Sequence, residues 1–371
     1  MTDSDPRQAL GDARARIDAL DAELQKLISQ RAGIAEEVRK IKEKSGVGGD
    51  HYRPSREVEV LQRAMQRNRE LGGPLPDTVV ARLMREIMSA CLALESPLTV
   101  AYLGPEGTYT QAAVYKHFGH AVEARPQTTT DEIFREVESG ATAYGVVPVE
   151  NSTEGVISHT LDRLAYTTLN ICGEVWLPVH HQLLSLQPQL QDIDVVYSHA
   201  QSFAQCRAWL DVHLPKAQRE ALSSNGVAAR RVSEAGAQTR SAAIASQAAG
   251  ELYGLPVLAS NIEDDPNNTT RFLIIGRKVS EPTGCDKTSL VLQLQQNRPG
   301  ALFHLLKPFA DEHVDMMRIE SRPSRRGLWD YNFFIDLEGH QDDETLRQVL
   351  GQVRPQAAFF KILGSYPKAV V

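Results

Sequence analysis

The sequence predicts a multidomain protein: an all-α segment, then an α/β domain and finally a small α+β module. Three observations support this fold class. Apolar residues repeat at helical spacing through residues 1–96, short apolar runs alternate with helical stretches from Leu98 onward, and the last ~80 residues have the order βαββαβ. We therefore expect domains at residues 1–96, 97–280 and 286–371.

The first segment begins with Ser4-Asp5-Pro6, which is typical of a helix start because a capping side chain precedes proline. An apolar stripe then continues until the glycines of residues 45–49, and its members are Ile17, Leu20, Leu24, Leu27, Ile28, Ile34, Val38 and Ile41. This predicts a helix of roughly 38 residues, about 57 Å long. Two shorter helices, near Pro54–Leu71 and Asp77–Glu95, cannot cover such a stripe. We expect a second subunit to cover it, in a homodimer or a higher oligomer.

The middle segment alternates strands with helices, which favours a sheet that binds ligands at the carboxyl ends of its strands. The expected strands are Leu98–Leu103, Tyr144–Val149, Val195–Tyr197, Ala242–Ala245 and Phe272–Ile275. The expected helices are Gln111–Phe118, Asp131–Glu138, Ala200–Leu210 and Asn225–Arg231.

A polar linker at Glu281–Asp286 precedes the last module. Its expected strands are Ser289–Gln295, Met316–Glu320, Tyr331–Leu337 and Phe359–Gly364, and its expected helices are Pro299–Asp311 and Asp343–Val353. This order is that of a ferredoxin-like fold.

The composition excludes several classes of function. The chain has 371 residues, of which 42% are hydrophobic and 23% charged, and its net charge of −7 argues against a nucleic-acid partner. No apolar run approaches the roughly 20 residues of a membrane span, and the polar amino terminus has no signal-peptide pattern. We expect a cytoplasmic protein without a membrane partner. The four cysteines form no CxxC pair, and no HExxH, GxGxxG or phosphate-loop motif occurs, so we expect no metal and no cofactor.

Three polar clusters adjoin buried runs of the middle segment. Thr270-Arg271-Phe272 follows Asn267-Asn268-Thr269, Glu150–Gly155 follows Gly145–Val149, and Tyr102–Thr108 opens a helix. Together these clusters resemble those of the prephenate dehydratases. The resemblance implies a two-lobed fold like that of periplasmic binding proteins, with the ligand in the cleft. It also implies the loss of CO2 and the ring hydroxyl from prephenate, which leaves phenylpyruvate.

The dehydratase resemblance assigns roles to several residues. Thr270 is expected to donate a hydrogen bond or proton to the leaving hydroxyl. Asn151, Ser198 and Gln205 are expected to be polar catalytic residues of the cleft, and Ser152 and Thr153 are expected to bind substrate. For Arg271 two roles stay open: it holds a substrate carboxylate, or it enters an ion pair between the lobes.

The three-helix pattern resembles the all-helical chorismate mutases, which rearrange chorismate to prephenate without nucleophile or cofactor. The matching catalytic residues are Arg14, Arg31, Lys42, Arg56, Glu57 and Glu95, and Cys91 is expected to contact substrate where many relatives have a hydroxyl residue. Arginine suits this task because its guanidinium binds carboxylates bidentately.

Helix geometry gives an independent argument for part of this set. Arg31 and Lys42 are eleven positions apart, about 1100° of rotation, so they share a face within about 20°. Arg14 lies about 100° from that face. In the family the corresponding arginine reaches into the partner's site, which is consistent with this offset.

The last module resembles ACT regulatory domains. Asn297-Arg298-Pro299-Gly300-Ala301-Leu302 follows the first strand, and Glu320-Ser321-Arg322-Pro323 ends the second. In the dehydratases these two motifs border the phenylalanine site between paired modules. The resemblance thus implies an allosteric site made by Asn297, Pro299, Gly300, Ala301, Leu302, Glu320, Ser321, Arg322 and Pro323. A module that only dimerises is the alternative.

The whole sequence therefore indicates a bifunctional enzyme of L-phenylalanine biosynthesis, with chorismate and prephenate as substrates and L-phenylalanine as inhibitor. Two alternatives remain: a non-catalytic regulator that senses an amino acid, and a dehydratase that prefers arogenate.

Glu95 generates a prediction about pH. Some relatives have glutamine there, and a glutamate can donate to the ether oxygen of chorismate only when it is protonated. The mutase rate should therefore fall as pH rises, and Glu95→Gln should flatten this dependence. Rates measured from pH 5 to 9 test it, and a wild-type rate that stays constant would refute it.

Overall fold

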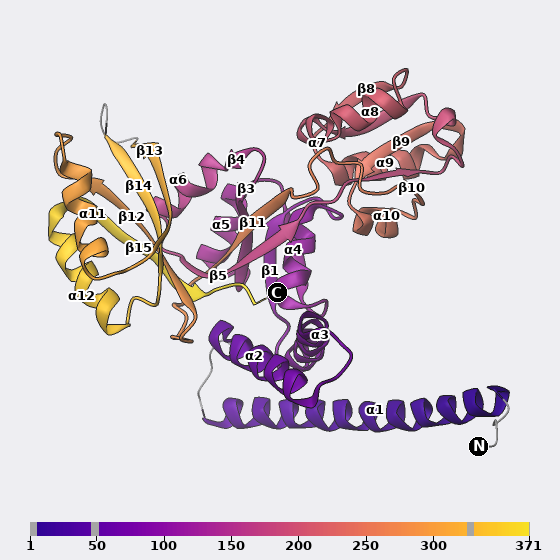
Figure 1. Cartoon of the computed structure of the whole chain (residues 1–371), viewed down its shortest axis with the longest axis horizontal. Coiled ribbons are helices and arrows are strands. Elements are labelled where there is room, and N and C mark those ends of the chain that lie inside the picture. The colour runs from indigo at the N-terminus through magenta and orange to yellow at the C-terminus, as the bar shows by residue number, and fades with distance from the viewer. Residues whose placement is uncertain (1–5, 46–51, 325–329, 371) are drawn as a thin grey trace.

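Three helices form the amino-terminal part of the computed structural model, which describes residues 6–45, 52–324 and 330–370 (Figure 1). They are α1 (Pro6–Ser45), α2 (Pro54–Leu71) and α3 (Asp77–Glu95). These bounds confirm the expected helices. Gly72 ends α2 in the left-handed region at φ 61°, which suits glycine. The expected start signal at Ser4-Asp5 and stop signal at residues 46–49 lie outside the described residues.

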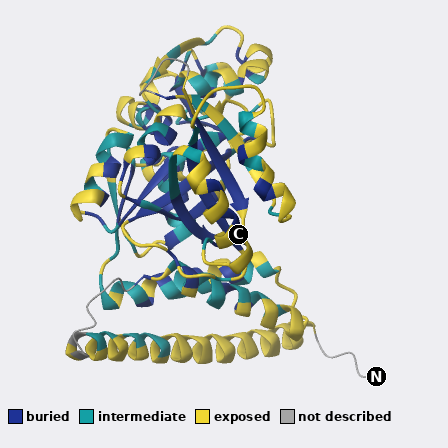
Figure 2. Cartoon of the chain, turned by 90° about the vertical axis from the view of Figure 1, so that its left-hand side faces the viewer, coloured by how far each residue is buried: buried dark blue, intermediate teal, exposed yellow. Residues whose placement is uncertain are grey.

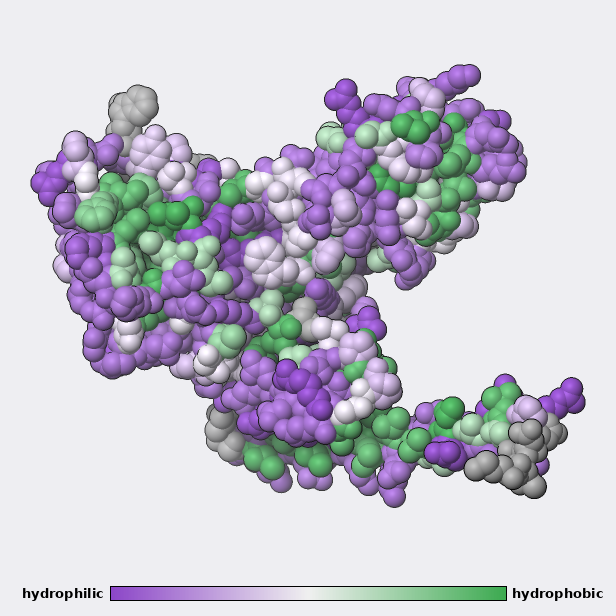
Figure 3. Space-filling view, in the orientation of Figure 1, coloured by the Kyte–Doolittle hydropathy of each residue, from purple (hydrophilic) through white to green (hydrophobic). Residues whose placement is uncertain are grey.

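The apolar stripe of α1 is exposed. Helices α2 and α3 pack on one part of α1, and Figure 2 shows most of α1 accessible to solvent, with hydrophobic residues along it in Figure 3. Leu20 is 59% exposed and Leu24 56%, and Leu10, Ile17, Leu27, Ile28, Ile34 and Ile41 are exposed as well. The single chain therefore leaves uncovered the stripe for which the sequence predicted a second subunit.

The first lobe of the middle domain is a sheet in the order β2-β1-β3-β11-β5. Its strands are β1 (Thr99–Leu103), β2 (Glu123–Gln127), β3 (Tyr144–Asn151), β5 (Asn170–Pro178) and β11 (Thr269–Gly276), and the short β4 (Gly155–Val156) pairs with β3. Strands β1, β2 and β3 are parallel, whereas β11 runs antiparallel between β3 and β5. Helices α4 (Tyr109–Phe118), α5 (Thr130–Ser139) and α6 (Ser158–Tyr166) belong to this lobe.

The second lobe has the strand order β10-β6-β9-β7-β8. The chain enters it after β5 and returns through β11, so two segments join the lobes. Its strands are β6 (Gln182–Ser185), β7 (Val195–His199), β8 (Gln218–Leu222), β9 (Ser241–Ala245) and β10 (Val257–Ala259). Its helices are α7 (Ala200–Gln205), α8 (Arg207–His213), α9 (Asn225–Ala235) and α10 (Gln247–Tyr253). The two-lobed fold expected from the resemblance is confirmed, although the expected helix Ala200–Leu210 is broken at Cys206.

The carboxyl-terminal module is a sheet in the order β13-β14-β12-β15 with two helices. The strands are β12 (Asp286–Leu294), β13 (Met316–Pro323), β14 (Tyr331–Glu338) and β15 (Ala357–Pro367), and the helices are α11 (Ala301–Asp311) and α12 (Glu344–Val353). The βαββαβ prediction is confirmed. Strand β12 begins inside the expected linker.

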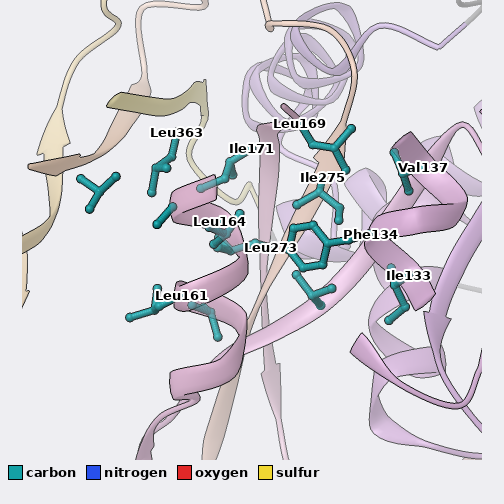
Figure 4. Close-up of a cluster of buried hydrophobic side chains, with 14 of the residues drawn as sticks. Ile133, Phe134, Val137, Leu161, Leu164, Leu169, Ile171, Leu273, Ile275 and Leu363 are labelled. Atoms are coloured by element: carbon teal, nitrogen blue, oxygen red, sulfur yellow. The ribbon is translucent and has the colours of Figure 1, made fainter. Parts of the chain in front are cut away.

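One hydrophobic core joins the first lobe to the carboxyl-terminal module (Figure 4). Leu161, Leu164 and Ile171 of the lobe pack in the same cluster as Leu363 of β15. The backbones come very close there: a Cβ on Gly364 would lie 2.2 Å from the carbonyl oxygen of Ile171. The first lobe also contacts the helices below it, so it lies at the centre of the molecule (Figure 1). Among the described helices, none is long and apolar enough to cross a bilayer.

Gly364 generates a stability prediction. Gly364→Ala should lower the free energy of unfolding by about 1–3 kcal/mol, because β15 and β5 must separate to admit the methyl group. Thermal unfolding measures this effect. Gly351→Ala is the matched control, because a Cβ there meets nothing within 4 Å and the residue lies in α12. Equal melting temperatures for Gly364→Ala and wild type would contradict the close contact.

Candidate active sites

A cavity of about 490 Å³ lies between the three amino-terminal helices. The structure brings six of the predicted mutase residues to its wall: Arg31, Lys42, Arg56, Glu57, Cys91 and Glu95. Arg14 is exposed near the amino-terminal end of α1 and does not line this cavity. That position agrees with the predicted offset, and the role of Arg14 in a partner's site stays a prediction.

Positive charge dominates this cavity. Five cationic side chains line it, namely Arg31, Lys42, Arg53, Arg56 and Arg85, against the two carboxylates of Glu57 and Glu95. The Lys42 Nζ lies 3.1 Å from Glu95 Oε2, and the Arg85 Nε lies 3.0 Å from Glu57 Oε1. Burial raises the pKa of Glu57, and the charge of Arg85 with hydrogen bonds from Arg85 and Tyr52 opposes this effect. The excess of cations suits a ligand with two carboxylates.

Sequence reasoning missed Arg85, which is only 8% exposed. A signal for it exists. Ala81, Arg85 and Ser89 are spaced by four residues in α3 and all are buried, so a cation occupies the apolar face of a helix. A buried arginine needs an anionic partner, and Glu57 supplies it.

A second cavity, of about 810 Å³, lies between the two lobes. Thr270 and Asn151 are directly opposed across β11 and β3, and both line this cavity. The Asn151 Nδ2 donates to Thr270 Oγ1 at 2.8 Å, while Asn151 Oδ1 accepts from the Thr153 hydroxyl at 2.6 Å. Because the Thr270 oxygen accepts this bond, its own hydrogen can point toward a ligand in the cleft.

Gln205 connects the second lobe to this pair. Its Oε1 accepts from the Asn268 amide at 3.1 Å, and its Nε2 donates to Thr153 Oγ1 at 3.1 Å. His181 Nε2 lies 2.9 Å from the same Oε1, and His181 Nδ1 lies 2.9 Å from the Tyr109 hydroxyl. Burial lowers the pKa of His181, opposed by its bond to Gln205. A continuous polar network therefore extends from Thr270 through Gln205 of the second lobe to Tyr109.

The structure corrects the expected position of three residues near the cleft. Ser198 is fully buried and donates to the Ile244 carbonyl, so it does not line the cavity; it contacts Asn225, which does. Ser152 bonds the backbone of residues 267 and 269 instead of facing the cavity. Thr153 holds Asn151 and Gln205 in place without lining the wall itself. Tyr109, His181, Asn225 and Arg230 are wall residues that sequence reasoning missed.

Arg271 requires the largest correction. It is only 3% exposed and lies outside the cleft, because adjacent residues of a strand face opposite sides of the sheet. Its Nε lies 2.9 Å from Glu174 Oε2, its Nη1 2.6 Å from Asp336 Oδ2, and its Nη2 donates to the Tyr366 hydroxyl at 3.0 Å. Glu174 belongs to the same lobe and the other two to the carboxyl-terminal module. Both expected roles, a substrate contact and an ion pair between the lobes, are wrong; Arg271 joins two domains.

The two motifs expected at the effector site lie at one edge of the last sheet. Strands β12 and β13 are both antiparallel to β14, which separates them, so their carboxyl ends meet at that edge. Gly300 adopts φ 79° before α11, as glycine readily does. Arg322 differs from expectation, because its guanidinium forms a bidentate pair with Asp162 of α6 at 3.0 and 3.2 Å. It contacts the first lobe instead of an open effector site.

The Arg271 cluster generates a prediction about acid stability. Burial alone would raise the pKa of Asp336, but the charge of Arg271 and hydrogen bonds from Ser289 and Arg271 hold it below its usual range. This stabilisation is present above the unfolded pKa of about 3.9 and is lost as pH falls through the lower folded value. Arg271→Met should move acid unfolding to higher pH and cost about 3–5 kcal/mol at neutral pH.

Acid titration followed by circular dichroism measures this shift. Arg125→Met is the matched control, because Arg125 pairs with Glu123 at the surface, where a salt bridge contributes little. An acid midpoint for Arg271→Met that equals the wild-type value would contradict the assigned role of the cluster.

Comparison with known proteins adds a separate line of support. The chain matches the family models for chorismate mutase type II over residues 13–96, prephenate dehydratase over residues 100–280 and the ACT domain over residues 288–355. It is 52% identical over 375 residues to the bifunctional chorismate mutase/prephenate dehydratase of Stutzerimonas stutzeri, with 100% of both chains covered. The enzyme of the same name from Aquifex aeolicus is 39% identical over 365 residues, which cover 98% of this chain and 99% of that one.

A solved structure supports the fold of the last two domains. The prephenate dehydratase from Arthrobacter aurescens in complex with L-Phe has 36% sequence identity and a TM-score of 0.68, and the match covers 73% of this chain and 90% of that chain. Three observations indicate the same family. The chain builds two cavities with separate polar side chains, it matches three family models in the same order, and its relatives match it over their full length. The chain belongs to the family of bifunctional chorismate mutase/prephenate dehydratases with a carboxyl-terminal ACT domain.

Proposed function

We propose that this chain rearranges chorismate to prephenate in the helical cavity, converts prephenate to phenylpyruvate in the cleft, and is inhibited by L-phenylalanine at the ACT domain. One observation carries the proposal: a single chain builds two distinct cavities, one rich in cations and one with a threonine donor. A non-catalytic regulator would need neither the cations of the first cavity nor the threonine donor of the second.

In the helical cavity the chemistry is positioning and charge stabilisation. Arg31 and Arg56 offer guanidinium groups to the two carboxylates of chorismate and hold its reacting carbons close together, while Arg85 holds Glu57 in the cavity wall. Negative charge grows on the ether oxygen as the C–O bond breaks. Two side chains are placed to donate to that oxygen: the Lys42 ammonium and, when it is protonated, Glu95, whose Oε2 lies 3.1 Å from Lys42 Nζ. No proton is gained or lost over the rearrangement.

In the cleft the chain assists the departure of hydroxide. One carboxylate of prephenate leaves as CO2, its electron pair enters the ring, and the ring C–O bond breaks to release hydroxide, which takes a proton from solvent to give water. The Thr270 hydroxyl supplies a hydrogen bond to that oxygen, and Asn151 holds it in the required direction at 2.8 Å. Since Arg271 faces away, Arg230 of the cavity wall is the cation that holds a remaining carboxylate.

The exposed stripe of α1 supports a homodimer. A second copy would cover apolar side chains such as Leu20 and Leu24, whose burial contributes roughly 25 cal/mol per Å² of apolar surface. The same association would bring Arg14 of one subunit toward the helical cavity of the other. The dimer is part of the proposal, as is the assignment of the effector edge to L-phenylalanine.

Feedback has a direct structural route. Thr270 opposes Asn151 across β11 and β3, and the next pair along the strands is Arg271 opposite Glu150. Arg271 contacts Asp336 of the ACT domain, and Glu150 Oε2 lies 2.9 Å from Arg318 Nε of the same domain. A shift of the ACT sheet on effector binding therefore acts one residue away from both catalytic side chains. The L-Phe held by the Arthrobacter relative supports the choice of effector.

Thr270 generates the test of the proposed function. Pure protein is incubated with chorismate alone, and prephenate and phenylpyruvate are followed separately. Wild type should yield phenylpyruvate without added cofactor. Thr270→Ala should lower the dehydratase rate by about 10²-fold or more, with prephenate accumulating at the wild-type rate, because only the cleft donor is lost.

Thr270→Ser is the matched control, because it keeps the hydroxyl, and it should retain most of the dehydratase rate. Full dehydratase activity in Thr270→Ala would overturn the role of Thr270. Chorismate that is not consumed by wild type would favour the regulator, and faster turnover of arogenate than of prephenate would favour the arogenate enzyme.

A further inference from the structure

The wall of the helical cavity is not made by the helical domain alone. Phe118, the last residue of α4 in the dehydratase domain, lines it beside Tyr52. Both side chains are buried, with Tyr52 6% and Phe118 3% exposed. Their rings pack with centroids 5.2 Å apart, and the Tyr52 ring also meets Tyr144 of β3 edge-on at 5.4 Å. The dehydratase domain therefore contributes surface to the mutase cavity.

Arg85 connects Glu57 to the dehydratase domain. Its Nε donates to Glu57 Oε1 at 3.0 Å, and its Nη1 donates to the Lys116 carbonyl oxygen at 2.9 Å. Lys116 lies in the last turn of α4, where carbonyl groups lack partners within the helix and carry partial negative charge. The guanidinium is thus fixed between a helix terminus of one domain and a carboxylate of the other.

Tyr52 makes a second connection. Its hydroxyl lies 3.1 Å from Nε2 of His117 and also hydrogen bonds to Glu57. Burial, with the nearby charge of Arg85, lowers the pKa of His117 to about 3, so the imidazole is neutral at physiological pH. Lys116 and His117 are consecutive residues of α4, and each holds one of the two groups that contact the Glu57 carboxylate.

Helix α3 and the end of α4 are in close contact, so a displacement of one helix would displace the other. Gly119 follows α4 at φ 76°, and a Cβ there would lie 2.5 Å from the Cβ of Ser89 in α3. The Ala121 amide donates to the Ser89 hydroxyl at 3.3 Å. A larger residue at position 119 would separate the helices, so the close approach depends on glycine at this point.

We propose that the end of α4, residues 116–118 of the dehydratase domain, is part of the mutase site: Phe118 forms wall, and Lys116 and His117 position Glu57 through Arg85 and Tyr52. The inference rests on the proposed mutase activity of the helical cavity. It means that the first reaction of this chain depends on the domain that performs the second. His117 is a positioning residue, because it reaches the cavity only through Tyr52.

The test uses the full-length chain with chorismate and prephenate assayed separately. His117→Ala should lower mutase kcat by about 10-fold or more with KM changed less, because misplacement of Glu57 affects the transition state most. The dehydratase rate should stay within about twofold of wild type, because His117 lies outside the cleft wall. His117→Gln should restore most of the mutase kcat, since an amide can bond the Tyr52 hydroxyl.

His120→Ala is the matched control. His120 also joins the domains, through Glu86 of α3 at 2.9 Å, but among the described residues it makes no hydrogen bond or ion pair with Tyr52, Arg85 or Glu57. The mutase rate of His120→Ala should therefore equal that of wild type. Adding His117→Ala to Tyr52→Phe should cause no further loss, because His117 acts on Glu57 only through the Tyr52 hydroxyl that Tyr52→Phe has already removed.

Three results would overturn the proposal: wild-type mutase kcat in His117→Ala, equal losses in His120→Ala and His117→Ala, or losses of Tyr52→Phe and His117→Ala that multiply in the double variant. If His117→Ala loses both activities through unfolding, Tyr52→Phe decides, and a wild-type mutase rate there refutes the proposal. A wild-type chain that does not consume chorismate refutes instead the proposed function, so the two failures are distinct.

Discussion

Side chains alternate between the two faces of β11, and this alternation fixes how the dehydratase cleft and the ACT domain are placed on the first lobe. Thr270 faces the cleft, and Arg271, the next residue, faces the ACT domain. The partner strand β3 repeats this arrangement with Asn151 and Glu150. A rigid, buried strand pair therefore carries Thr270, the proposed dehydratase donor, on one face and the contacts of the regulatory domain on the other. No displacement of one face can leave the other unaffected, because both belong to the same backbone.

The first lobe contacts every other part of the molecule that the structure describes. Its sheet shares a hydrophobic core with β15, its helix α4 ends against the mutase helices, and its cleft faces the second lobe. Buried charges reinforce these boundaries: Arg271 and Lys287 both contact Glu174, and Arg322 contacts Asp162. Such pairs contribute little net stability, but removal of one partner is costly, so they specify how the domains dock. Through these contacts the first lobe connects the helical cavity, the cleft and the ACT domain physically.

Much of this was accessible from the sequence. Helical periodicity gave the bounds of α1–α3, and the apolar runs gave β1, β3, β7, β9 and β11. Strands β2 and β8 were missed because their sequences, EARPQ and QREAL, are those of polar edge strands without an apolar run. The mutase set was predicted from the resemblance to the chorismate mutases, and a shared helix face supported only part of it, Arg31 and Lys42. Ser198 and Arg271 were misplaced because motif matching does not say which side of a strand a residue faces, and Arg85 was missed because its partners belong to other elements.

In the proposed inhibition Arg318 links the effector edge to the cleft, since it pairs with Glu150 and contacts no residue of the cavity wall that the structure describes. The most direct measurement is dehydratase rate against L-phenylalanine concentration for wild type, Arg318→Gln and the surface control Arg347→Gln. If inhibition passes through β3 and β11, Arg318→Gln should need about tenfold more L-phenylalanine for half inhibition while its uninhibited rate stays near wild type, and Arg347→Gln should behave as wild type. An inhibition curve for Arg318→Gln that coincides with that of wild type would contradict the coupling through β3 and β11.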